Sequence, residues 1–148
     1  MKRVLSIFTL LVCVALAVSA SAQGTTAPTA GMKITTDAEF STHMKEIQQQ
    51  NGVLNKSIKG GMTEEATKAA ARLEVLFKNI HGYWSEKKVA DATAAADTAV
   101  TSLQAVQKAL ASKDLAAAET ARATFAGTCM TCHTAHREKL PEGGFRIK

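Results

Sequence analysis

The chain has 148 residues and a formal net charge of +5, and 46% of its residues are hydrophobic although only 5% are aromatic. This length suits one domain with a single core. The basic residues are spread along the chain and do not form a cluster, which argues against a nucleic-acid-binding protein.

The first 22 residues are typical of a secretory signal peptide. Lys2 and Arg3 precede an almost wholly apolar run over residues 4–18, and a small-x-small sequence ends at Ala22. The apolar run is too short for a comfortable membrane span, so we expect cleavage after Ala22, with an uncleaved anchor as the alternative. The sequence therefore predicts residues 1–22 as a signal peptide and residues 23–148 as a single mature domain in the periplasm.

Export determines how the cysteines are interpreted. Cys13 lies inside the signal peptide and would leave with it, so Cys129 and Cys132 are the cysteines of the mature chain. A free vicinal pair tends to oxidise in such a compartment. Removing Lys2 and Arg3 takes two positive charges from the net charge of +5 and leaves +3. With no second hydrophobic span, we expect a soluble product.

Apolar residues of the mature chain recur at three- and four-residue spacings, the period of a helix, in four segments. The first begins at a capping box formed by Thr36 and Glu39 and ends at the glycines of residues 60–61. The second begins at Thr63 and ends at a polar break over residues 85–88.

The third and fourth segments complete the pattern. The third runs from about Asp91 to Leu110, and residues 112–114 make a tight connection to the fourth, which begins at Leu115 and is expected to end at Pro141. Short connections make sequential helices antiparallel neighbours. The sequence therefore predicts an all-α, up-down-up-down four-helix bundle.

A C-x-x-C-H motif lies at residues 129–133, near the C-terminus. Two thiols at this spacing followed by an imidazole suit c-type haem attachment, in which Cys129 and Cys132 bond the porphyrin and His133 binds the iron as proximal ligand. On a helix, spacings of three and four place all three side chains on one face. Covalent attachment of one haem c to this helix would also occupy both thiols.

Other readings of the motif fit less well. A thioredoxin-like dithiol needs a strand-to-helix context that the sequence lacks. A zinc site could add His136, but a continuous helix spreads Cys129 and His136 about 10 Å along its axis, too far for tetrahedral coordination. A disulfide between Cys129 and Cys132 leaves His133 without a role. The motif therefore favours haem.

With these features the chain resembles the class II c-type cytochromes, the cytochrome c′ group and its low-spin relatives. The family pattern is C-x-x-C-H-x-x-aromatic-Arg. Arg137 matches it, whereas His136 stands where an aromatic residue is usual, and we expect His136 to face solvent. The resemblance covers essentially the whole mature chain, although its specific part is this C-terminal run.

The resemblance implies roles for further residues. Low-spin members place a methionine of the first helix on the distal side of the iron, which designates Met44 here, with ordinary core packing as the alternative. His43 is the nearest rival, and we expect it at the edge of the apolar stripe. Arg137 is expected at a haem propionate, with a solvated charge as the alternative.

The function that follows is one-electron transfer between redox partner proteins. With His133 and Met44 both on the iron, no position remains for a substrate, so we do not expect an enzyme. The alternative is a five-coordinate protein that binds NO or CO. Family members commonly form homodimers through their first two helices, and no nucleic-acid partner is expected.

Overall fold

The computed structural model describes residue 29 and residues 31–148. The predicted signal peptide, its cleavage site after Ala22 and Cys13 lie outside the described residues. Within the described part of the chain, no helix is long and apolar enough to cross a membrane.

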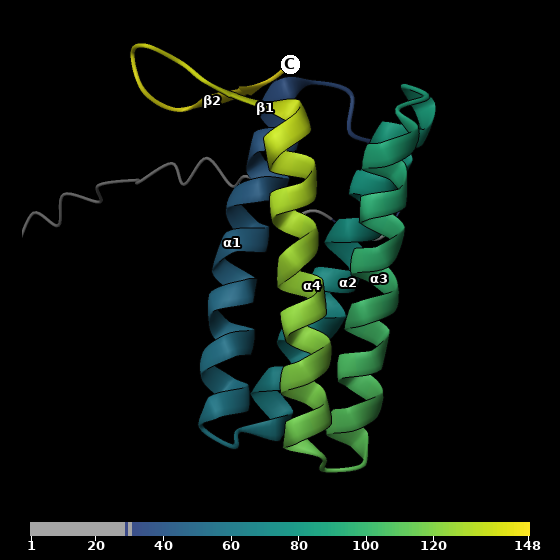
Figure 1. The fold of residues 1–148 in the computed structure, drawn as a ribbon, viewed down its shortest axis with the longest axis vertical. Helices are drawn as coiled ribbons and strands as arrows, with labels where there is room; N and C mark the ends of the chain where they lie inside the picture. Colours follow the sequence, from purple (N-terminus) through teal and green to yellow (C-terminus); the bar gives the residue numbers. More distant parts are fainter. Residues whose placement is uncertain (1–28, 30) are drawn as a thin grey trace, which may run out of the picture.

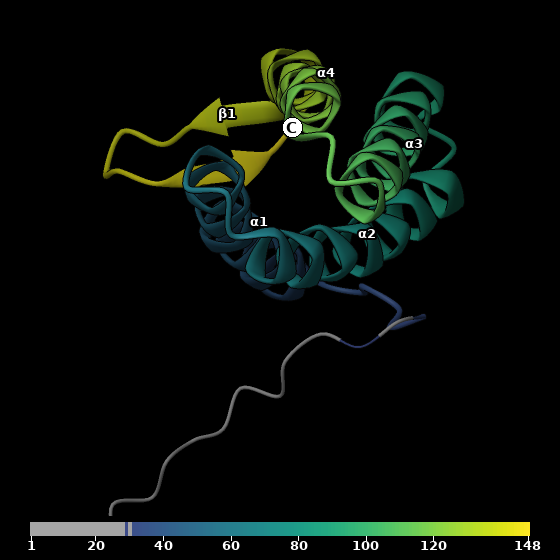
Figure 2. The same ribbon diagram turned by 90° about the horizontal axis from the view of Figure 1, so that it is seen from below.

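Four long helices form the molecule. Their bounds are α1 Asp37–Lys59, α2 Thr63–Glu86, α3 Ala90–Ala111 and α4 Leu115–His136. Each helix runs antiparallel to the one before it, and α1 packs on α2, α2 on α3 and α3 on α4 (Figures 1 and 2). Contacts between α4 and α1 are few by comparison. The predicted all-α, up-down-up-down four-helix bundle is confirmed.

Local signals in the sequence set the helix ends. The backbone N–H of Glu39 donates to the Thr36 hydroxyl while the Glu39 carboxylate accepts from the Thr36 N–H, so the predicted capping box starts α1. Gly61, at φ +69°, makes the left-handed turn after this helix, a conformation that costs glycine little. Asp114 caps α4, because its carboxylate accepts from the N–H of Ala117 at 2.9 Å.

The core is aliphatic along most of its length and aromatic at one end. Phe40 of α1 packs against Tyr83 and Trp84 of α2, with ring centroids 4.7 and 5.7 Å away. Nearer the middle, Phe125 of α4 meets Phe77 of α2 edge to face at 5.3 Å. The aromatic end therefore lies where α1 begins and α2 ends.

Polar contacts between helices supplement the core. Glu46 of α1 pairs with Arg72 of α2, both with largely covered side chains. Glu74 of α2 accepts hydrogen bonds from two α3 side chains, Gln104 at 3.0 Å and Gln107 at 2.7 Å. These contacts fix the rotation of α2 against both neighbours.

The predicted end of α4 is wrong. The helix stops at His136, and the next residues form a strand, β1 Arg137–Lys139, that pairs antiparallel with β2 Phe145–Ile147. Pro141 lies in the turn between the strands and does not end the helix. Ile147 is half-buried against the core, so a tertiary contact favours the hairpin over another helical turn.

Candidate functional site

The C-x-x-C-H motif occupies the last two turns of α4. Cys129, Cys132 and His133 are all half-buried, and the exposed Met130 between them points away from the bundle. Cys132 packs against the hydrophobic core. The structure thus brings the three predicted haem-binding residues together on the side of α4 that faces the other helices.

Burial shifts the pKa of all three groups in the direction that favours the neutral form. It raises the pKa of the Cys129 thiol, and it raises that of Cys132 with a further contribution from the charge of Asp91. It lowers the pKa of His133, and the charge of Arg137 acts in the same direction. The site therefore holds two neutral thiols and a neutral imidazole at neutral pH, and neutral imidazole is the form that binds metal.

The two edges of α4 face different neighbours. Asp91 at the start of α3 approaches Cys132 and bonds His136, which places α3 on that edge. On the other edge lies Glu119, which feels the charge of Lys59 at the end of α1. At 100° per residue, His133 lies within about 40° of Glu119 around the helix. His133 is therefore on the α1 side of α4.

Met44 lies on the matching side of α1. It is about 200° around α1 from Glu46, which pairs with α2 through Arg72, and it is half-buried against the core. Because α1 begins at the end of the bundle where α4 ends (Figure 1), Met44 and His133 are near one end, about 10 and 5 Å into their helices. The fold brings the two predicted axial ligands to one region.

Small side chains face this region from α3. The buried positions in the first half of that helix are Ala92, Ala96 and Ala99, all at most 3% exposed. Trp84 of α2 is also close, and its buried indole Nε1 has no hydrogen-bond partner among the described residues. This end of the bundle therefore combines small buried side chains on α3 with an indole N–H donor on α2 that has no partner among the described residues.

His136 does not face solvent, contrary to expectation. Its ring lies 5.1 Å from the Trp84 ring, and its Nε2 is 2.8 Å from a carboxylate oxygen of Asp91. This bond is the main reason that the pKa of Asp91 is below its usual value. His136 thus packs at a tilt against the Trp84 ring, where the resembled family has an aromatic residue, and it ties α4 to α3.

His43 is not at the edge of the apolar stripe. It is 1% exposed, its Nδ1 is 2.9 Å from the carbonyl of Glu39, and its Nε2 is 3.3 Å from Nδ2 of Asn79. The spacing could have revealed this position, since His43 lies three residues after Phe40 and four before Ile47. Asn79, its partner on α2, carried no signal in the sequence.

Arg137 is exposed at the start of β1. Its guanidinium lies 4.1 Å from the ring centroid of Phe145, a cation–π contact across the hairpin. It forms no ion pair with a described carboxylate, so the charge remains available near His133. A propionate contact at this residue stays a prediction.

The geometry of the site bears on each alternative to haem. A reactive dithiol needs a lowered thiol pKa, and burial raises both here. Across residues 29 and 31–148, no three His, Cys, Asp or Glu side chains are grouped as a metal-ion site requires. The two thiols are free, so no disulfide joins Cys129 to Cys132.

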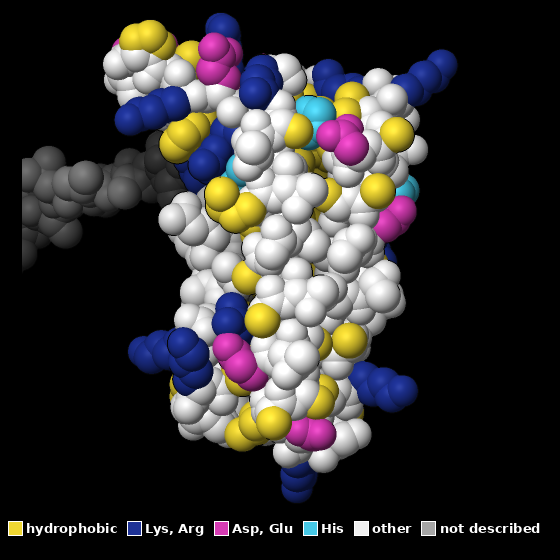
Figure 3. Space-filling view, viewed as in Figure 1, with side chains coloured by type: hydrophobic (Ala, Val, Ile, Leu, Met, Phe, Trp, Pro, Cys, Tyr) yellow, Lys and Arg dark blue, Asp and Glu magenta, His cyan; other side chains and the backbone are white. Residues whose placement is uncertain are grey.

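The face that α4 presents is mixed in charge. Figure 3 shows basic and acidic side chains toward the two ends of the bundle, with a largely uncharged middle.

The comparisons with known proteins found no match among family models, curated proteins or solved structures.

Proposed function

We propose that this protein is a periplasmic mono-haem c-type cytochrome that carries single electrons between redox partner proteins. One observation carries the proposal: the C-x-x-C-H side chains lie on the inward side of α4, and Met44 lies on the α4 side of α1 at the same end of the bundle. Export by the predicted signal peptide would bring the chain to the compartment in which haem c is attached.

The residues present fit a covalently held haem. Cys129 and Cys132 supply two protonated thiols three residues apart, which is what addition to two vinyl groups requires. His133 supplies a neutral imidazole from the same face. Two donors could serve haem carboxylates: the Trp84 Nε1 and the Arg137 guanidinium, neither of which has a hydrogen-bond or ion-pair partner among the described residues.

When bound, haem supplies an iron that accepts and releases one electron. The chain's own residues set the conditions for that chemistry. Met44 offers a thioether, which as an axial partner of histidine raises the reduction potential. The buried side chains at this end of the bundle, among them the alanines of α3, give the site an apolar surrounding that would limit access of water to the group.

The hydrogen bonds made by the His43 ring favour Met44 over His43 as the distal ligand. Asn79 Nδ2 donates to the Thr29 carbonyl at 2.9 Å, which identifies it as nitrogen, so its second hydrogen is directed at His43 Nε2. Nδ1–H of His43 then donates to the Glu39 carbonyl. Both imidazole nitrogens are used within the bundle, whereas the Met44 sulfur makes no hydrogen bond to a described residue.

Two further expectations belong to the same proposal. With His133 and Met44 as axial ligands, no iron position remains for a substrate, which is why we propose an electron-transfer protein and not an enzyme. A homodimer through α1 and α2 is implied by the family resemblance alone. If Met44 does not bind the iron, the five-coordinate alternative that binds NO or CO takes its place.

Haem attachment can be tested directly. The full chain is expressed with a haem-attachment system in a bacterial host, the periplasmic product is purified, and haem that survives denaturation is measured together with the N-terminal sequence. We expect one covalent haem per chain and an N-terminus at Gln23. The matched control replaces Cys129 and Cys132 with Ala and should lose covalent haem. Wild-type protein without covalent haem would refute the proposal.

A further inference from the structure

A polar contact deep in the bundle sits next to the proposed distal ligand. His43 is 1% and Asn79 4% exposed, and they connect α1 to α2 at a point where neighbouring buried residues of α1, such as Phe40 and Ile47, are apolar. Burying polar groups costs free energy unless their hydrogen bonds are made. An apolar pair would fill the same space, but it would not fix an orientation.

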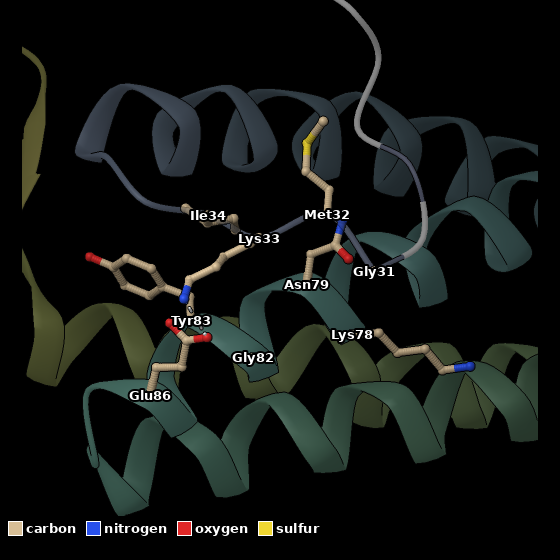
Figure 4. A pocket seen from close by; sticks show the side chains of 9 residues that line it. All are labelled: Gly31, Met32, Lys33, Ile34, Lys78, Asn79, Gly82, Tyr83 and Glu86. Carbon is tan, nitrogen blue, oxygen red and sulfur yellow. Dashed lines mark ion pairs between the residues drawn. The ribbon is translucent and has the colours of Figure 1, made fainter.

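The contact has directional anchors on both sides. His43 is held on its own helix by the Glu39 carbonyl, and Asn79 is held by the carbonyl of Thr29 in the segment before α1. Figure 4 shows Asn79 on α2 facing that segment, beside a cavity of about 170 Å³. An exposed ion pair between Lys33 and Glu86, with 3.1 Å between nitrogen and oxygen, also joins this segment to α2. The His43–Asn79 contact, together with the Glu46–Arg72 ion pair, therefore fixes how α1 is rotated against α2.

Rotation of α1 decides where the Met44 sulfur lies. Met44 follows His43 and projects about 100° around the helix from it. Side-chain tips lie about 5–6 Å from a helix axis, so turning α1 by about 20° moves the sulfur by about 2 Å. A metal–ligand distance tolerates only about 0.2 Å. A small rotation is enough to break a methionine–iron bond.

We infer that His43 and Asn79 are positioning residues that hold Met44 on the haem iron. They touch neither iron nor porphyrin in this role and act through the rotation of α1. The inference rests on the proposed function and deepens it, because it assigns to a buried hydrogen bond the control of sixth-ligand occupancy.

The test uses purified haem-loaded protein and four variants. Asn79→Leu and His43→Leu remove the contact, and His43→Gln keeps an acceptor for Asn79 Nδ2. Leu54→Ala is the control, since Leu54 is fully buried on the same helix, nearly three turns beyond Met44. For each protein we would measure haem content, the methionine-to-iron charge-transfer band of the oxidised form and the rate at which the reduced form binds CO.

We expect Asn79→Leu and His43→Leu to keep their haem, to weaken the charge-transfer band and to bind CO about tenfold faster than wild type, the scale set by one lost buried hydrogen bond. His43→Gln and Leu54→Ala should stay within about threefold of wild type, although Leu54→Ala unfolds more easily.

Unchanged bands and CO rates in both Leu variants, or an equal acceleration in Leu54→Ala, would overturn the positioning role while leaving the proposed function intact. Wild-type protein that carries haem but has no methionine band would instead overturn the assignment of Met44, and the positioning role with it. Absence of covalent haem from wild type would overturn the proposed function itself.

Discussion

Phe125 allows a quantitative test of how α4 is seated in the bundle. Its ring is fully buried and meets Phe77 edge to face, 5.3 Å between centroids, one turn before Cys129. Replacing a buried Phe with Ala costs about 3–5 kcal/mol. About 0.5–1.5 kcal/mol of that loss belongs to the aromatic pair. Domains have a free energy of unfolding of about 5–15 kcal/mol, so Phe125→Ala should lower the melting temperature by on the order of 10–20 °C.

The assay is urea and thermal unfolding of Phe125→Ala, followed by circular dichroism. The matched control is Met130→Ala on the same helix, where the side chain is 64% exposed, and it should change the free energy of unfolding by less than about 0.5 kcal/mol. A loss below about 1 kcal/mol for Phe125→Ala would mean that α4 does not pack on α2 through this ring.

Three further outcomes are expected. Met44→Ala should convert a low-spin haem protein to a high-spin one that binds CO readily, as optical spectra would show; an unchanged spectrum would send the assignment to another ligand. Burial raises the pKa of Glu74, but hydrogen bonds from Lys78 and two glutamines together lower it below its usual value of 4.5. Glu74→Gln should therefore destabilise the fold at pH 7 by about 1–3 kcal/mol. That difference from wild type should disappear as the pH falls below 4.5 through the folded-state pKa, and Glu64→Gln, at an exposed ion pair, is the control that should change little. Cys129→Ala alone should retain haem through one thioether but yield less holoprotein, measured as covalent haem per chain; full loading would deny Cys129 a role.

Local signals predicted most of the fold. The Thr36–Glu39 capping box, the glycines after α1 and the start of α4 at Leu115 are all present in the structure, because each depends on residues within a turn of the boundary. The end of α4 was mispredicted, since the hairpin depends on Ile147 reaching the core. No local pattern encodes that contact.

The candidate site divides in the same way. The C-x-x-C-H motif could be placed on one face of a helix because its spacing is local. The partners of His43 and His136 could not, because Asn79 and Asp91 are 36 and 45 residues away in the sequence. Each contact depends on how two helices are rotated against each other, and periodicity does not specify that rotation.

The optical spectrum of the mature protein in both oxidation states tests the proposed haem site most directly. Haem bound through Cys129 and Cys132 with His133 and Met44 on the iron predicts a low-spin reduced form, a methionine-to-iron charge-transfer band in the oxidised form and slow CO binding. A high-spin reduced form that binds CO at once would contradict the Met44 assignment and favour the gas-binding alternative. Mature protein with no haem absorption would contradict the proposal that the chain is a c-type cytochrome.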